Sequence, residues 1–262
     1  ALTLVELLRD SGLDCSTNCI LFHLSDELGE WLHSWRLPAL HRATEIQRCI
    51  RAEFLPPSRR GGNLAGVFEE NDAQLIDTAP PWAAMVAFSA VLAAASSGCA
   101  YIAVGNERSA NFGNGISWLG ISVNHQYDKS LEWERLANGY IRRYLQARLW
   151  YFSGLVRMWG VEIAERFCRE DAAARYLSLF ISCNTPQLTN THSRWCAACP
   201  KCAFVFLLLS AWLPSARCWS VFGDNLFEVP QLLPVFRALL GIKGEGSRKT
   251  IKPLECVGTP EE

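Results

Sequence analysis

The sequence predicts an α/β protein with an open, mainly parallel sheet that lacks its first strand, followed by a helical region with a four-cysteine metal site. Helix and strand patterns alternate over the first half of the chain, and helical patterns dominate the second half. Four cysteines are closely spaced between residues 183 and 202. We therefore expect an α/β domain over residues 1–127 and a mainly helical region over residues 128–262.

The chain opens inside a helical pattern. Leu2, Val5, Leu7 and Leu8 repeat at helical spacing, Gly12 is a stop signal, and residues 19–22 read as a short strand. Helix, turn and strand in this order form the second half of a βαβ unit. We therefore expect the first strand, and the phosphate-binding loop that follows it, to lie upstream of Ala1. The glycine pair at residues 61–62 lacks the strand–loop–helix setting and is interpreted as a surface loop.

The remaining elements follow from periodicity and turn signals. A long uncharged stretch over residues 78–106 is interpreted as a buried helix (81–95), a turn, and a buried strand (100–104), because Ser and Gly interrupt it at 96–98. Membrane insertion is therefore not expected. A second strand is predicted at 118–123. Helices are predicted over residues 26–54, 131–149, 160–168, 171–180 and 204–212.

Composition and charge limit the classes of function. The chain has 262 residues, is 50% hydrophobic and carries a net charge of −1. A nucleic-acid-binding protein normally has a basic surplus, so small-molecule partners are favoured and nucleic acid is not expected. An odd count of 11 cysteines fits incomplete disulfide pairing and a reducing, cytoplasmic compartment.

Cys183, Cys196, Cys199 and Cys202 form the pattern C-x12-C-x2-C-x2-C. Two residues between cysteines let a tight turn direct both thiolates at one ion, and a distant fourth cysteine closes a tetrahedral site. Structural Zn²⁺ is the expected metal, with an iron–sulfur cluster as the alternative. His192 could replace one cysteine, and ordinary buried cysteines are the non-functional interpretation.

A polar run at residues 106–111 directly follows the predicted strand at 100–104. Ligands of open α/β sheets bind at the carboxyl ends of strands, so this run is expected to meet a substrate. Its side chains suit an anionic group or a metal–phosphate. A plain polar loop is the alternative. The candidate binding residues are Asn106, Arg108, Ser109 and Asn111.

A second polar run, residues 124–130, follows the predicted strand at 118–123, so both runs are expected on the same side of the sheet. His125 could act as a general base because the ordinary pKa of histidine lies near neutrality, although a structural histidine is the common alternative. Glu132 or Glu134 could hold a metal or interact with the helix dipole. The candidate binding residues are Asn124, Gln126, Lys129, Ser130 and Glu132.

Five stretches resemble the family of UDP-N-acetylmuramoyl-L-alanyl-L-glutamate epimerases. They are residues 106–115 (NERSANFGNG), 123–132 (VNHQYDKSLE), 182–184 (SCN), 195–204 (WCAACPKCAF) and 252–262 (KPLECVGTPEE). Together these motifs are fairly specific, although each alone is weak.

The resemblance implies a fold of the PP-loop ATP-pyrophosphatase (adenine nucleotide alpha-hydrolase-like) type. It implies that ATP, with Mg²⁺, adenylates the α-carboxylate of the terminal L-Glu in UDP-MurNAc-L-Ala-L-Glu and that this residue is then converted to D-Glu. That reaction belongs to peptidoglycan precursor biosynthesis and thus to cell wall and cell shape. Because the ATP phosphate loop is expected upstream of Ala1, this chain by itself is expected to be impaired or inactive.

The resemblance also suggests roles for individual residues. His125 and Glu107 are candidates for acid–base or metal roles, and Arg108 and Lys129 for binding anionic groups of the substrate. Cys256 is a further candidate, since a cysteine can serve as the acid–base of a stereochemical inversion.

Two other functions stay open. The deazaguanine synthases look similar in joining a PP-loop domain to a C-terminal four-cysteine site, so another PP-loop enzyme that adenylates a carboxylate to form an amide or nitrile is one alternative. A non-catalytic, zinc-stapled interaction module is the other.

Overall fold

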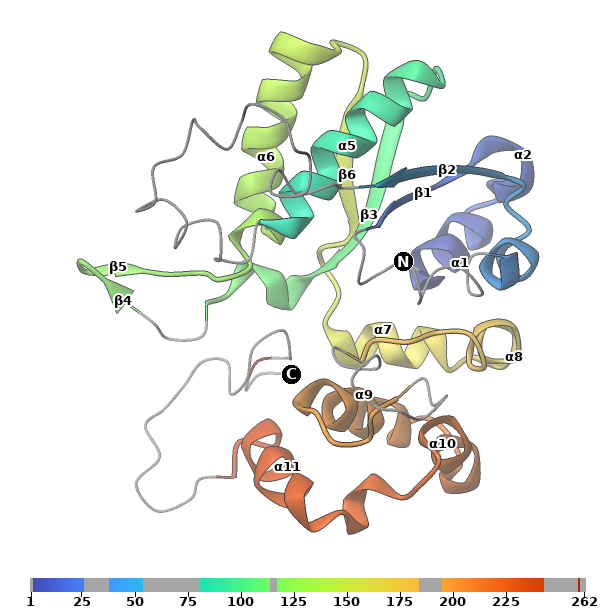
Figure 1. Ribbon diagram of the computed structural model, residues 1–262, viewed down its shortest axis with the longest axis vertical. Helices are drawn as coiled ribbons and strands as arrows, with labels where there is room; N and C mark the ends of the chain where they lie inside the picture. The colour runs from blue at the N-terminus through green and yellow to red at the C-terminus, as the bar shows by residue number, and fades with distance from the viewer. Residues whose placement is uncertain are drawn as a thin grey trace, which may run out of the picture. The chain divides into compact units, whose positions relative to one another are not determined.

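A computed structural model describes residues 2–25, 38–53, 81–113, 117–183, 195–242 and 259 (Figure 1). Contacts divide the chain into two compact units, each made of segments that are distant in sequence. The first unit comprises residues 1–13, 103–135 and 153–262, and the second comprises residues 14–102 and 136–152. The domain boundary predicted at residue 127 stays a prediction.

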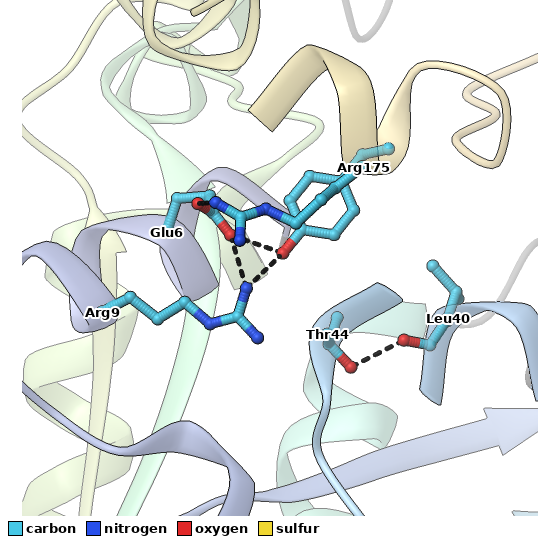
Figure 2. Close-up of polar contacts among 6 residues, drawn as sticks. Glu6, Arg9, Leu40, Thr44 and Arg175 are labelled. Carbon is cyan, nitrogen blue, oxygen red and sulfur yellow. Dashed lines mark hydrogen bonds and ion pairs between the residues drawn. The ribbon is translucent and has the colours of Figure 1, made fainter. Parts of the chain in front are cut away.

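The second unit contains a parallel pair of strands, β1 (Ile20–Ser25) and β2 (Arg48–Glu53), preceded by the one-turn helix α2 (Cys15–Asn18). β1 confirms the strand predicted at residues 19–22. The helix predicted over 26–54 is wrong at β2, where Arg51 and Glu53 are exposed and Ala52 between them is half-buried, the alternation of a strand. The helical residues 38–44 end where Thr44 Oγ1 donates to Leu40 O at 2.7 Å (Figure 2).

A second strand pair consists of β3 (Tyr101–Glu107), which follows helix α5 (Trp82–Ser96), and β6 (Trp150–Leu155). α5 and β3 confirm the helix and strand predicted over 81–104. Trp150 N donates to Ala100 O, and Arg108 N donates to Met158 O, both at 2.9 Å, so the strands run in the same direction. The sequence did not predict β6.

The helix predicted over residues 131–149 is shorter than expected. α6 spans Leu131–Tyr140 and continues as a π-helix, η5 (Ile141–Leu145). The chain then turns into β6, where Tyr151 N donates to Asn138 Oδ1 at 2.9 Å. One asparagine thus ties the end of α6 to the new strand.

The strand predicted at residues 118–123 is wrong. The structure has instead an exposed antiparallel hairpin, in which β4 (Ser117–Trp118) pairs with β5 (Ile121–Ser122). Leu119 and Gly120 both have positive φ, +49° and +78°, which is the backbone of a two-residue hairpin turn. Residues 124–130 therefore do not follow a buried strand of a larger sheet.

The first unit contains helices at both ends of the chain. α1 (Leu2–Asp10) confirms the opening helix. α7 (Gly160–Phe167), α8 (Glu170–Tyr176) and α9 (Pro200–Ser210) confirm the helices predicted at 160–168, 171–180 and 204–212, although α9 begins four residues earlier. α10 (Ser215–Phe222), two short 3-10 helices (Leu226–Glu228 and Pro230–Leu232) and α11 (Leu233–Leu239) follow. Phe206, Phe222 and Phe236 form their buried aromatic core.

Polar contacts fix α1 against α8 (Figure 2). Glu6 accepts hydrogen bonds from Arg9 and Arg175 at 3.1 Å and from the buried Tyr176 hydroxyl at 2.5 Å. Burial, the hydrogen bond to Glu6 and the charge of Glu6 raise the pKa of Tyr176. The network holds the first helix of the chain to a segment about 170 residues away in sequence.

The described strands form three two-stranded sheets, one of them the exposed hairpin. The fold is therefore mixed α/β with small parallel pairs and a helical region that contains a cysteine cluster, which confirms the predicted α/β class but not the single open sheet. The PP-loop type is a finer assignment and stays a prediction. Among the helices in the described ranges, none combines the length and hydropathy needed to cross a bilayer.

Candidate functional site

The four predicted cysteines converge in the first unit. Their Sγ atoms all lie within 4.8 Å of one another. The Sγ atoms of Cys183 and Cys199 are 3.9 Å apart, those of Cys196 and Cys202 are 3.7 Å apart, and those of Cys199 and Cys202 are 3.5 Å apart. A tetrahedral ion with four bonds to sulfur of about 2.3 Å requires sulfur–sulfur distances of about 3.8 Å. The thiols are therefore spaced as ligands of one ion.

Local structure around α9 holds three of these thiols in place. Cys199 is the N-cap of α9, and its Sγ accepts a hydrogen bond from Cys202 N at 3.4 Å. Cys196 Sγ accepts from Cys199 N at 3.3 Å, across a turn in which Ala197 has φ of +53°. Each two-residue spacer therefore closes a turn that directs backbone N–H groups at sulfur. Such donors favour the thiolate that a metal needs.

An aromatic core supports the cluster. Trp195 directly precedes Cys196 and is buried between the rings of Phe180, at 5.1 Å, and Phe222, at 4.6 Å. Hydrogen bonding with the Cys183 and Cys199 thiols that favours the protonated form, together with burial and the charges of those two groups, raises the pKa of Cys202. Without a cation the Cys202 thiol therefore favours its protonated form, and a bound cation reverses that preference. An iron–sulfur cluster has to fit several irons between its cysteines, so this close spacing favours a single ion.

The first polar run is split between β3 and the 3-10 helix η3 (Arg108–Asn111). Asn106 Nδ2 donates to Ser153 Oγ of β6 at 3.1 Å, and Ser109 Oγ donates to Glu107 Oε1 at 3.2 Å. Asn111 Nδ2 donates to Arg108 O at 2.9 Å. Much of the polarity of this run therefore serves to hold the turn at the end of β3.

The second polar run surrounds the 3-10 helix η4 (Tyr127–Lys129) and the start of α6. Asn124 Oδ1 accepts from Gln126 N at 3.0 Å. Ser130 Oγ donates to Tyr127 O at 2.7 Å and accepts from Trp133 N at 3.2 Å, which caps α6. His125 is half-buried beside the buried side chain of Gln126, with 3.5 Å between His125 Nε2 and Gln126 Nε2.

Two asparagines join the polar runs into one site. Asn124 Nδ2 donates to Ala110 O at 2.8 Å, and Asn111 Oδ1 accepts from Leu131 N at 2.7 Å. The backbone also approaches closely, because a Cβ atom on Gly113 would overlap Val123 O. The two runs therefore lie together, but the predicted reason is wrong, because the second run follows the hairpin of β4 and β5 and not a strand of the same sheet as β3.

An aromatic pair that the sequence reasoning missed orients one predicted residue. The Arg108 guanidinium lies over the Trp159 ring, 4.5 Å from its centroid, and Phe112 stacks on the same indole at 5.8 Å. Trp159 N donates to Glu162 Oε2 at 2.7 Å, which holds the backbone of Trp159 at the start of α7. The sequence signal was weak, since only Phe112 belongs to a motif. Stacking leaves the edge of a guanidinium available to an anion.

Of the remaining predicted residues, two lie within the described ranges and two lie outside them. Lys129 is half-buried in η4 and Glu132 is exposed on the first turn of α6. Burial, and then the charge and a hydrogen bond of Glu132, raise the pKa of Tyr127. Cys256 and His192 lie outside the described residues.

Two family models match the chain. The model described as the MurL N-terminal domain matches residues 36–154, and the model described as the MurL C-terminal domain matches residues 179–262. These ranges contain both polar runs and all four cysteines of the cluster.

Three relatives carry the name UDP-N-acetyl-alpha-D-muramoyl-L-alanyl-L-glutamate epimerase. The protein from Xanthomonas oryzae pv. oryzae is 32% identical over 270 residues, covering 100% of this chain and 52% of the relative. The Salinispora tropica protein is 36% identical over 197 residues, covering 75% and 41%, and the Micromonospora protein is 36% identical over 162 residues, covering 62% and 34%. The chain thus spans about half the length of these relatives or less. No solved structure matches it significantly.

Proposed function

This chain belongs to the MurL family, and from that premise we propose that it takes part in ATP-dependent epimerisation of the terminal L-Glu of UDP-MurNAc-L-Ala-L-Glu. The observation that carries the proposal is the similarity of the whole chain to a relative named as this epimerase. The reaction would belong to cytoplasmic peptidoglycan precursor synthesis. The PP-loop fold is part of the same proposal.

Activation of the carboxylate explains why such a reaction needs ATP. Removing the α-proton beside a free carboxylate places a carbanion next to a negative charge. Attack of the carboxylate on the α-phosphate of ATP would form an acyl adenylate and release pyrophosphate. The adenylate removes that charge, and the enolate that forms can then be stabilised by hydrogen-bond donors and cations. Hydrolysis of the adenylate after inversion would release AMP and restore the carboxylate. A base removes the proton from one face and an acid returns it to the opposite face.

The joined polar runs supply groups for these steps. Arg108, oriented by Trp159, would bind a carboxylate or phosphate of the substrate, and Lys129 would bind a second anionic group. His125 and Glu107 are the proposed acid–base or Mg²⁺-binding groups, with Cys256 as a further acid–base. The asparagines and Ser130 would act mainly by holding the runs together, since their side chains already hydrogen-bond the backbone.

Cys183, Cys196, Cys199 and Cys202 would hold one structural Zn²⁺. All four ligand positions are filled by protein, which is typical of structural rather than catalytic zinc. A bound ion would join residue 183 to the start of α9 and so stabilise the helical region.

The decisive experiment is a product assay on the protein as its gene encodes it. It is incubated with Mg²⁺ and UDP-MurNAc-L-Ala-L-Glu, with and without ATP, and the Xanthomonas oryzae relative serves as positive control. Acid hydrolysis and chiral chromatography measure D-Glu, and AMP is measured in parallel. D-Glu that appears only with ATP is the expected result.

Two other outcomes identify the alternatives. AMP release without D-Glu would retain adenylation but point to a PP-loop enzyme that forms an amide or nitrile. Neither product, under conditions where the positive control turns over, would overturn the proposal in favour of a non-catalytic zinc-stapled module.

In an active protein, Trp159→Phe should retain the orientation of Arg108, whereas Trp159→Leu should raise KM for the anionic substrate with little change in kcat.

A further inference from the structure

The second unit exposes a continuous apolar face on two neighbouring helical segments. On α5, Phe88 and Leu92 are one turn apart, and on α6 and η5, Leu136, Tyr140 and Tyr144 follow at helical spacing. Phe88 and Tyr140 are in edge contact at 6.0 Å, and Tyr140 and Tyr144 are 5.1 Å apart. We call these five residues the apolar face.

This face is unusually exposed for large apolar side chains. Leu92 is 75% exposed, Leu136 is 62% exposed and Tyr144 is 63% exposed. α5 has no charged residue, and it buries only the side formed by Ala87, Ala90, Val91 and Ala94. A helix that is apolar all round is normally buried all round. A contiguous exposed apolar patch of this kind marks a binding surface.

Arginines border one end of the face, and the exposed carboxylate of Glu132 lies one turn before Leu136 at the other end. The sequence between Glu134 and Glu162 contains five arginines and no Asp or Glu, in a chain whose net charge is −1. Arg142, Arg143 and Arg148 lie in a run of seven consecutive exposed residues, 142–148, at the end of the face. The Arg142 guanidinium lies 3.8 Å from the Trp150 ring centroid, and the Arg143 guanidinium lies 5.3 Å from that of Tyr144.

This charge pattern selects among binding partners. A second copy would leave most of these arginines without an acidic partner, because Glu132 is the one exposed carboxylate on the described stripe of α6 and η5, and this disfavours a symmetric dimer. Nucleic acids bind proteins through cations at the phosphates and aromatic rings at the bases, so the exposed aliphatic side chains of Leu92 and Leu136 would contribute little to binding them. An anionic bilayer surface matches all three components: aliphatic side chains reach the acyl boundary, tyrosines occupy the interface, and arginines meet lipid phosphates.

We propose that the apolar face and its arginine border bind the surface of an anionic lipid bilayer. The association is peripheral and uses the exposed sides of α5, α6 and η5; α5 and α6 lie side by side in Figure 1. It requires no spanning helix. It is independent of the epimerase reaction, because Phe88, Leu92, Leu136, Tyr140 and Tyr144 lie outside both polar runs.

The test is flotation of the full chain with vesicles of phosphatidylcholine, with and without phosphatidylglycerol. Binding is expected only with phosphatidylglycerol and should weaken as salt rises. Arg142→Glu with Arg143→Glu should weaken it by roughly thirtyfold or more, since each basic residue near an anionic surface contributes about fivefold. Leu92→Ser with Tyr144→Ser should weaken it by roughly tenfold or more through lost apolar burial.

Arg169→Glu with Arg237→Glu is the matched control. Both arginines are exposed in the first unit, and the pair changes the net charge by the same amount. Should the Arg142/Arg143 variant lose its fold by circular dichroism, the single exposed Arg148→Glu replaces it with an expected fivefold loss. No flotation with phosphatidylglycerol, equal binding to neutral vesicles, or an equal loss in the control would overturn the proposal. A concentration-dependent dimer that Leu92→Ser abolishes, without vesicle binding, would assign the face to a second copy instead.

Discussion

The cysteine cluster and the joined polar runs differ in how their motif residues are used. All four cysteines direct their sulfur atoms at one point. In the polar runs, Asn111, Asn124 and Ser130 hydrogen-bond the backbone of the runs themselves, and Arg108 instead stacks on an indole. The cysteine motif thus consists of metal-ligand side chains, whereas most side chains of the polar runs hold the backbone and only a few are available to bind a substrate.

The difference teaches how far a polar motif can be interpreted. Cysteines repeated at fixed spacing contribute little to structure through hydrogen bonds, because thiols form only weak ones. Amides and hydroxyls hydrogen-bond backbone readily, so a mixed polar run has many structural uses. The following predictions test whether the cluster depends on an ion and the polar runs on backbone packing.

Loss of the metal ligands should have the largest effect. Cys199→Ser preserves a good N-cap for α9 but removes one sulfur of the cluster. We expect a loss of more than about 3 kcal/mol in the free energy of unfolding, because a structural ion contributes directly to folding. Thermal unfolding with and without a chelator, with metal content by atomic emission, measures it. Cys168→Ser, outside the cluster, is the control. If the protein contains no metal and its unfolding is unchanged by the chelator, the cluster does not depend on an ion, and the proposed difference from the polar runs is wrong.

Substitution of Gly113 should have an intermediate effect. Its Cβ would overlap Val123 O, and the backbone of both runs would have to shift. We expect Gly113→Ala to lower the free energy of unfolding by about 2 kcal/mol. Gly139→Ala in α6 is the matched control, because the space around it is open and helix propensity predicts a gain of about 0.5–1 kcal/mol. Urea unfolding measures both, and equal stabilities would show that the runs do not depend on this close approach.

Alkaline pH should have an effect no larger than that of Gly113→Ala, and it separates ordinary buried cysteines from the cluster. Burial and the neighbouring Cys218 thiol raise the pKa of Cys168 from 9.0 to about 11, and burial raises that of Cys218 to about 11. Because the folded-state pKa values are raised, the stability they contribute is complete below pH 9 and is lost as pH rises toward 11. At pH 10 each fully shielded thiol would lose about 1.4 kcal/mol, and solvent screening at the half-buried Cys168 reduces the combined loss at that pH to about 2 kcal/mol. Melting temperatures against pH measure it, and an unchanged slope in the Cys168→Ala, Cys218→Ala variant would contradict it.

The sequence by itself determined the features that depend on local periodicity and spacing. α1, α5, α7, α8 and the cysteine cluster could be predicted because helix patterns and ligand spacing are local properties. The family resemblance could also be recognised from the sequence, since motif residues occur in a fixed order along the chain.

Tertiary structure decided the features that depend on distant partners. β2 and β6 were missed because each is a strand only by pairing with another segment, and Asn138 sets the start of β6 through contacts that sequence spacing does not reveal. Gly113 against Val123, Arg108 on Trp159, and the exposed side of α5 were invisible for the same reason. Hydrogen bonding and burial are properties of pairs of segments, and a single sequence specifies only one member of each pair.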